Sequence, residues 1–150
     1  MVVKKLIEVM RIILSLTIFI LLIIIGEGKR DANQKLKACC ARQKNADKDC
    51  KRKFCDFNIL TKDNVMTFLN TCNPKGTTVQ DMWDCASSRV DHTDCCKKNN
   101  VVEECLPYCK SGNSTPTEYF KHLFCMQAFN GIKNCFRNYL ETHPNIFGDK

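Results

Sequence analysis

The sequence has no cysteine in residues 1–38 or 136–150, and no two of its cysteines stand in the C-x-x-C spacing. Thiol oxidoreductases usually carry that spacing. Structural zinc sites typically use C-x(2–4)-C pairs with two further ligands at similar spacing, and the C-x3-C of Cys105 and Cys109 or the C-x4-C of Cys50 and Cys55 would need a histidine such as His92 or His122 to complete such a set. We therefore expect no metal site and no thiol redox chemistry.

Histidine is also scarce, with three residues, His92, His122 and His143. His92 lies between two aspartates, an arrangement that a solvated turn explains as well as a catalytic dyad. His122 precedes an apolar pair and is expected to be a partly exposed helix residue. No serine or cysteine nucleophile accompanies them in a recognisable pattern. We predict no enzymatic activity, no catalytic residues and no cofactor.

Cysteine itself is abundant, and the twelve cysteines of the chain form a six-cysteine pattern that occurs twice in succession. Each interval in the second half is within three residues of its counterpart in the first. The first half holds Cys39, Cys40, Cys50, Cys55, Cys72 and Cys85; the second holds Cys95, Cys96, Cys105, Cys109, Cys125 and Cys135. An even number suits a fully paired framework, which persists in an oxidising compartment. The sequence predicts a duplicated disulfide framework.

The adjacent pairs Cys39-Cys40 and Cys95-Cys96 constrain the pairing. Neighbouring Cα atoms lie about 3.8 Å apart, below the roughly 4.4 Å minimum of ordinary disulfides. Each member of a pair should therefore bond elsewhere, so that the pair ties its own segment to two others. The duplication predicts the same connectivity in both halves, although the spacing leaves the individual partners open.

The N-terminus resembles an export signal. Lys4, Lys5 and Arg11 precede an apolar run over residues 12–25, and Gly26 and Gly28 follow it. The run has 14 residues, fewer than the roughly 20 that span a bilayer. We predict a signal peptide over residues 1–28 and a secreted, extracellular protein. The alternative is an uncleaved signal anchor that tethers the domain to the membrane, since no alanine marks a cleavage site.

Positive charge is concentrated after this segment. Residues 29–53 hold ten Lys or Arg against three Asp, a net charge of +7, whereas residues 54–150 sum to −1. Residues 29–38 form a basic lead-in to the cysteines. A solvated helix face is the simplest explanation, and a contact surface for an anionic partner is the functional one. Lys48, Lys51, Arg52 and Lys53 are the candidate contact residues, and no nucleic acid partner is expected.

Hydrophobic periodicity between the cysteines is helical. In the first half, apolar residues from Val65 to Cys72 form one stripe that Thr61 is expected to cap. Asn73-Pro74-Lys75-Gly76 should end this helix, and Thr78 should open the next. Loops are expected at 56–61, 73–78 and 110–115.

The second half repeats this pattern. Thr115, Pro116 and Glu118 form a candidate capping box, and Asn130-Gly131 should break the following helix before the apolar face of residues 132–140. We expect the aromatic residues to belong to the core rather than to a ligand groove; they are Trp83, Phe120, Phe124, Phe129, Phe136 and Tyr139. Asn113, in Asn113-Ser114-Thr115, is a glycosylation candidate.

Together these features resemble the DB module, a nematode extracellular domain with twelve cysteines. The resemblance covers residues 39–140 and is most specific at Asp91-His92-Thr93-Asp94-Cys95-Cys96, at Val102 to Cys109 and at Asn134-Cys135-Phe136. It departs at Asn45-Ala46-Asp47 and Asn100-Val101-Val102, where the family often shows a Gly-Val-Pro-like stretch. The resemblance implies a secreted or membrane-tethered domain without catalytic residues, leaving 141–150 as a C-terminal tail.

We therefore predict an all-α, small disulfide-rich helical domain built from two similar six-cysteine halves. Its expected function is that of a secreted binding module that presents a rigid surface to an extracellular protein or an anionic matrix or membrane component. The alternative is a carrier of a small apolar ligand or lipid, because bridged helical bundles can enclose a cavity. No feature of the sequence specifies an oligomeric state.

Overall fold

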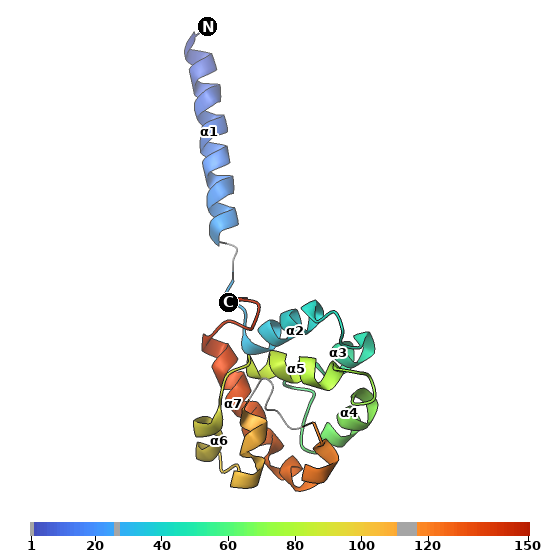
Figure 1. Cartoon of the computed structure of the whole chain (residues 1–150). Helices are drawn as coiled ribbons and strands as arrows, with labels where there is room; N and C mark the ends of the chain where they lie inside the picture. Colours follow the sequence, from blue (N-terminus) through green and yellow to red (C-terminus); the bar gives the residue numbers. More distant parts are fainter. Residues whose placement is uncertain (1, 26–27, 111–116) are drawn as a thin grey trace.

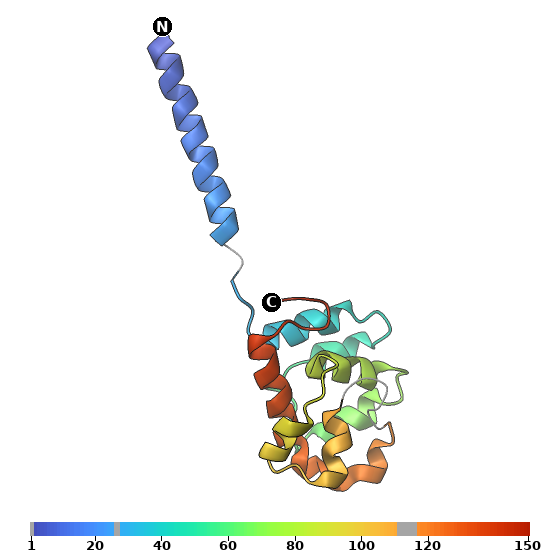
Figure 2. The ribbon, with the colours of Figure 1, turned by 60° about the vertical axis from the view of Figure 1, so that its left-hand side comes forward.

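A computed structural model of the chain describes residues 2–25, 28–110 and 117–150, and within them the fold is all-α with no strand. The first helix, α1 (Val2–Ile25), stands apart from the others as a separate rod (Figures 1 and 2). Its side chains from residue 3 to residue 20 are exposed. Among the side chains that the structure describes, no helix combines the length and the hydropathy of a membrane span.

Each half places four helices in the same order along its cysteine pattern, although the second and third helices of the second half are 3₁₀ rather than α. The first half consists of α2 (Ala32–Arg42), α3 (Lys48–Phe54), α4 (Val65–Cys72) and α5 (Thr78–Ser87). The second consists of α6 (Thr93–Lys98), the 3₁₀ helices η1 (Glu103–Cys109) and η2 (Tyr119–Ala128), and α7 (Phe129–Thr142). Equivalent cysteines lie on equivalent elements, which confirms the predicted duplication at the level of structure.

The halves share one core rather than two. Helix α7, from the second half, makes its most extensive contacts with α2 and α5 of the first half. In Figure 1, α7 runs down one side of the domain while α2 and α5 extend across from it. The buried face of α7 carries Ile132, Phe136 and Leu140. The period of these residues fits one helical stripe, so α7 closes the core of both halves.

Two helix boundaries differ from the sequence-based expectation. Helix α4 begins at Val65, where the Val65 N–H donates to the Thr61 carbonyl (3.0 Å), so Thr61 acts through its backbone rather than as a side-chain cap. The predicted break at Asn130-Gly131 is wrong, because α7 runs through it. A Cβ at Gly131 would lie 3.2 Å from the Asn99 carbonyl oxygen, so this glycine permits close packing instead of ending a helix.

Segments on both sides of residues 39–140 contact the helical body. Residues 32–38 of the basic lead-in form the first turns of α2, and the C-terminal segment turns back onto that helix. Asn145 is 4% exposed, and its side-chain amide donates to the Lys35 carbonyl (2.9 Å). The Arg30 N–H donates to the Lys150 carbonyl (3.3 Å). Both flanks are therefore part of the domain.

The aromatic residues divide between core and surface. Phe129 and Phe136 are buried, as predicted. Phe120 and Phe124 are about half exposed on η2, so their assignment to the core is wrong. Their assignment to the core assumed an α-helical period, which does not hold in the 3₁₀ helix η2, because a 3₁₀ helix has three residues per turn and turns different side chains inward.

Candidate functional site

The disulfide framework determines how every candidate site is held. The structure pairs all twelve cysteines and leaves none free. The six bridges are Cys39–Cys85, Cys40–Cys55, Cys50–Cys72, Cys95–Cys135, Cys96–Cys109 and Cys105–Cys125. Counted within a half, both sets pair first with sixth, second with fourth and third with fifth. The identical connectivity agrees with the prediction from the duplication.

Each adjacent pair ties its helix to two others, as its geometry requires. On α2, Cys39 bonds to α5 and Cys40 bonds to Cys55 at the end of α3. On α6, Cys95 bonds to α7 and Cys96 bonds to η1. The bridges constrain the unfolded chain within each half, whereas packing through α7 joins the halves.

A DB module match covers residues 39–136, the span that holds all twelve cysteines. The chain belongs to the DB module family. This disulfide-rich module is an extracellular type of domain, and its family is non-catalytic and of unknown function. No enzyme family is indicated by the comparisons.

Two relatives of this DB module come from Caenorhabditis elegans. Ig-like and fibronectin type-III domain-containing protein 2 is 28% identical over 111 residues, which is 73% of this chain and 7% of that protein. Ig-like and fibronectin type-III domain-containing protein 1 is 31% identical over 85 residues, which is 57% of this chain and 8% of that protein. The chain thus spans less than a tenth of the length of either relative. No solved structure matches it.

Much of the basic arm of the DB module has a structural role. Lys35 is 1% exposed, and its ammonium donates to the carbonyls of Leu140 (2.6 Å) and His143 (2.9 Å) at the end of α7. Burial lowers the pKa of Lys35, and Lys29 adds to this effect. Cations suit the carbonyl end of a helix, which explains why α7 tolerates this charge.

Three further cations of the arm form intramolecular ion pairs. Arg30 and Arg42 both contact the Asp149 carboxylate, at 2.9 and 2.8 Å. Lys37 contacts Asp56 at 2.6 Å. The side chains of Asn145, Arg30 and Arg42 hold the pKa of Asp149 below its ordinary value. The strongly basic composition of residues 29–53 therefore overstates the charge available to a partner.

The four candidate contact residues all lie on α3, but they are not equivalent. Lys48 is exposed, and Lys53 is exposed with its ammonium 4.9 Å from the centre of the Phe54 ring. Arg52 is exposed and contacts Asp49 at 2.8 Å. Lys51 is half-buried and donates to the Gln43 carbonyl (2.6 Å). Lys48, Arg52 and Lys53 are thus the exposed cations of α3, and we call this set the α3 face, while Lys51 supports the preceding loop.

His92 occupies a different environment from the one predicted. It is 5% exposed, with its ring 4.9 Å from that of Phe136 and 5.2 Å from that of Tyr139. Its Nε2 lies 2.7 Å from the Ser87 carbonyl oxygen and must carry the proton, since a carbonyl only accepts. The solvated turn is therefore wrong. The sequence did not indicate the burial of His92, because the residue stands between Asp91 and Asp94 in a connection too short to show a hydrophobic period.

The two remaining histidines each contact a tyrosine side chain. His122 is half-buried, as expected, and its Nδ1 lies 3.0 Å from the Tyr108 hydroxyl. His143 is exposed and stacks on Tyr139.

Burial, with smaller contributions from Tyr108 and Asp84, raises the pKa of Tyr119 to about 12. Among the described residues, no group of three or more His, Cys, Asp or Glu is placed to hold a metal ion.

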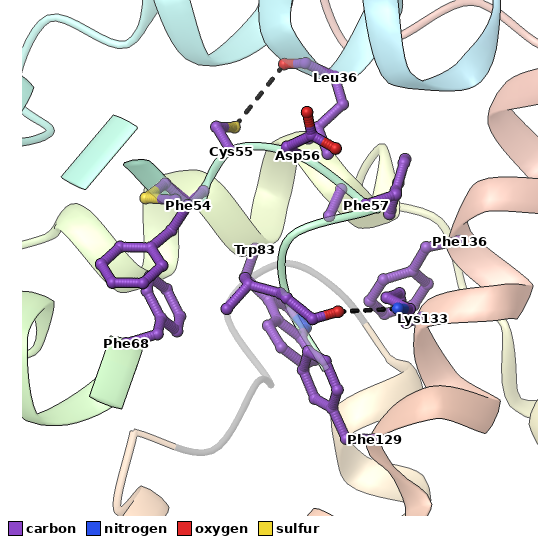
Figure 3. A pocket seen from close by; sticks show the side chains of 13 residues that line it. Leu36, Phe54, Cys55, Asp56, Phe57, Phe68, Trp83, Phe129, Lys133 and Phe136 are labelled. Atoms are coloured by element: carbon purple, nitrogen blue, oxygen red, sulfur yellow. Dashed lines mark hydrogen bonds between the residues drawn. The ribbon is translucent and has the colours of Figure 1, made fainter. Parts of the chain in front are cut away.

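Two apolar cavities flank Trp83, a feature that the sequence analysis did not separate from the core. Figure 3 shows one of them, with the Trp83 indole between Phe68 on one side and Lys133 and Phe136 on the other. The second lies toward Tyr108, Tyr119 and η2. Each offers ≈ 50 Å³ to the centre of a water-sized sphere. Phe68, Trp83 and Phe129 line both cavities.

Two sequence-based candidates cannot be placed. Asn113, the glycosylation candidate, and Thr115-Pro116 of the capping box lie outside the described residues. Glu118, the remaining residue of that box, is described, and it directly precedes η2, which begins at Tyr119.

Proposed function

We propose that this DB module is a non-catalytic binding module that works outside the cell and presents a rigid surface to an extracellular protein or anionic matrix component. The observation that carries the proposal is the α3 face. Three exposed cations, of which Arg52 contacts Asp49, lie on one short helix. That helix is bonded to α4 through Cys50–Cys72, and its C-cap residue is bonded to α2 through Cys40–Cys55. A pre-organised surface loses less conformational entropy when it binds than a flexible one.

The size of the two apolar cavities beside Trp83 favours this function over lipid transport. Pockets for drug-sized ligands occupy about 300 to 1,000 Å³, several times the ≈ 50 Å³ available on either side of Trp83. A lipid chain would require a large opening of the core, which the disulfides within each half oppose.

Export is part of the proposal. Residues 1–28 act as a signal peptide, or alternatively as an anchor that leaves the cysteine domain outside the cell. Sequencing the N-terminus of protein recovered from culture medium tests this choice. A start near Lys29 supports cleavage, whereas retention of the whole chain in the membrane fraction supports the anchor. Loss of mass on enzymatic deglycosylation would support modification of Asn113.

The decisive experiment reverses the charge of the α3 face. In the variant Lys48→Glu, Arg52→Glu, Lys53→Glu, Lys51 is left intact because its bond to Gln43 is structural. The matched control, Lys62→Glu, Lys97→Glu, Lys98→Glu, changes net charge equally at exposed sites elsewhere.

Binding is measured on heparin beads, as a sulfated glycan, and by proximity labelling of extracellular proteins. We expect the α3 variant to elute at lower salt and to lose labelled partners, with the control much less affected. If both variants lose binding equally, binding depends on the net charge of the protein, and the α3 face is not the contact surface. If neither changes, the candidate surface is lost.

A further inference from the structure

An open cleft lies between α2 and α3, which pack against each other in the first half of the domain (Figure 1). Three residues from each side line it, namely Lys37, Cys40 and Ala41 of α2, and Lys51, Arg52 and the C-cap residue Cys55 of α3. On each side the residues are three and four positions apart, the spacing that brings side chains to one face of a helix. The cleft is therefore formed by two facing helix surfaces.

The floor of this α2–α3 cleft is neutral and its walls are basic. Cys40 and Cys55 are 1% and 5% exposed and are bonded to each other, so a disulfide forms the floor. The side chains of Lys37 and Arg52 are 56% and 81% exposed, one on each helix, and Lys51 is half-buried. Among the described residues, every charged side chain that lines the cleft is a cation. The cleft therefore suits an anionic ligand.

The protein partners of the exposed cations are easily replaced. Lys37 contacts Asp56 at 2.6 Å, and Arg52 contacts Asp49 at 2.8 Å. Ion pairs of exposed side chains add little to stability, so an anionic group of a ligand can join or replace either carboxylate at little cost.

Lys51 also keeps donor capacity for a ligand. An ammonium has three N–H donors, and the bond from Lys51 to the Gln43 carbonyl uses one of them. Lys51 can therefore support the preceding loop and contact an anion in the cleft at the same time.

The cleft separates the cations of the α3 face into two groups. Lys48 precedes Lys51 and Arg52 by three and four positions on α3, so it extends the basic row beside the cleft. Lys53 is exposed but does not line the cleft, and its ammonium lies 4.9 Å from the centre of the Phe54 ring. Lys53 is therefore an internal control for any ligand held in the cleft.

A stiff polyanion fits this surface better than an acidic peptide does. The described residues that line the cleft include no neutral polar side chain with which to recognise the side chains of a peptide. A sulfated glycan carries fixed negative groups on both edges of a chain of rigid rings. It can therefore contact both basic walls while its rings lie over the neutral floor. A rigid chain also loses less conformational entropy on binding than a flexible one.

We propose that the α2–α3 cleft binds a sulfated glycan chain, whose sulfate groups contact Lys37 on one wall and Lys51 and Arg52 on the other. This site rests on the proposed binding function, gives its ligand a chemical class and adds Lys37 of α2 to the contact residues.

The test is the affinity of the intact oxidised protein for a heparin oligosaccharide of defined length, measured by calorimetry at several salt concentrations. Lys37→Met with Arg52→Met removes one cation from each wall of the cleft. The matched control, Lys53→Met with Lys98→Met, removes two exposed cations that do not line it. We expect the cleft variant to bind about tenfold more weakly and the control to lose less than about threefold. The slope of log affinity against log salt should fall by about two in the cleft variant, because each lost contact releases about one counterion fewer.

A second variant separates a direct contact from an effect of net charge. Lys37→Met with Asp56→Asn removes one cation and one anion, so the net charge stays that of the wild type. If Lys37 contacts the glycan, this variant should bind about two- to fivefold more weakly. Wild-type affinity would overturn the proposal. In the ¹⁵N-labelled wild-type protein, amide shifts on titration should centre on residues 37–41 and 51–55, which tests the site even if a variant folds poorly.

Three other results would also overturn the proposal. They are equal losses in the cleft variant and its control, shifts centred outside α2 and α3, and equal affinity for polyglutamate of the same charge, which would indicate an acidic peptide as the ligand. If the α3 charge reversal still abolishes labelling of extracellular proteins while the Lys37 variants bind heparin normally, the α3 face stands and the cleft is lost. If that reversal also has no effect, both are lost.

Discussion

Lys35 is a charged residue that belongs to the core. Replacing it by methionine keeps its length but leaves the carbonyls of Leu140 and His143 without their donor. Hydrogen bonds to charged groups contribute about 1.5 to 3 kcal/mol each. Methionine avoids the desolvation of a buried ammonium, which offsets part of this loss. We therefore expect Lys35→Met to lower the free energy of unfolding of the oxidised protein in urea by about 2 to 3 kcal/mol, less than the sum of the two bonds.

The control for that variant is Lys37→Met on the same helix. Lys37 is exposed and its ion pair with Asp56 is at the surface, where such pairs contribute about 0 to 1 kcal/mol. If the two variants lose equal stability, the ammonium of Lys35 does not cap α7 in solution.

His92 should make stability depend on pH. Burial lowers the pKa of His92 below its ordinary value of 6.5, against the opposing effects of its bond to Ser87 and of Asp91. The unfolded chain then binds a proton at a higher pH than the folded one. Stability should therefore be complete above the unfolded pKa, fall as the pH drops through 6.5, and level off below the lower pKa of the folded state.

Urea unfolding at several pH values between roughly 7.5 and 5 measures this slope. Asp56, Asp91 and Asp149 have pKa values below the ordinary value, so they act at lower pH. His92→Phe should flatten the curve, whereas His143→Gln, at an exposed site, should leave it unchanged. A wild-type curve that is flat from pH 7 to pH 5 would contradict this role of His92.

At the scale of one helix, the packing of α7 depends on Gly131, the third residue of that helix. A helix normally gains about 1 kcal/mol from Gly→Ala, but a methyl group at Gly131 would meet the Asn99 carbonyl at 3.2 Å and Val101 Cγ2 at 3.3 Å. Those atoms follow α6, which Cys95–Cys135 holds against α7. We expect Gly131→Ala to give no gain in thermal stability, or a loss.

Asn134→Ala provides the comparison, because Asn134 is exposed on the same helix. That change should raise stability by a few tenths of a kcal/mol through helix propensity alone. A Gly131→Ala protein that gains more than Asn134→Ala would show that α6 and α7 separate easily.

The elements also show what the sequence could predict. Cysteine spacing and the stripes of α4 and α5 are local patterns, and they led to the helical class, the duplication and the shared connectivity. The burial of Lys35 depends on carbonyls more than one hundred residues away, and that of His92 on rings from α7. Gly131 was assigned to a break because the residue it packs against, Asn99, directly follows α6 and is distant in the sequence. Such contacts have no local signal.

At the scale of the whole molecule, the bridges stay within halves while the core crosses between them. Mass spectrometry of peptides cut between the cysteines, under non-reducing conditions, should recover six bridges with none joining residues 39–85 to residues 95–135. One bridge between the halves would contradict the connectivity. Because α7 packs on α2 and α5, the oxidised protein should nevertheless unfold in a single transition, followed by circular dichroism.

The first and last segments of the folded body meet at one point, through Arg30 with Lys150 and Asp149. When the two ends of a domain lie together, the domain adds little to the end-to-end length of the polypeptide. In a long multidomain protein, such a module projects to one side and adds binding surface without increasing the distance between its neighbouring domains. Its spacing to neighbouring domains would then be set by the flanking linkers rather than by its own diameter.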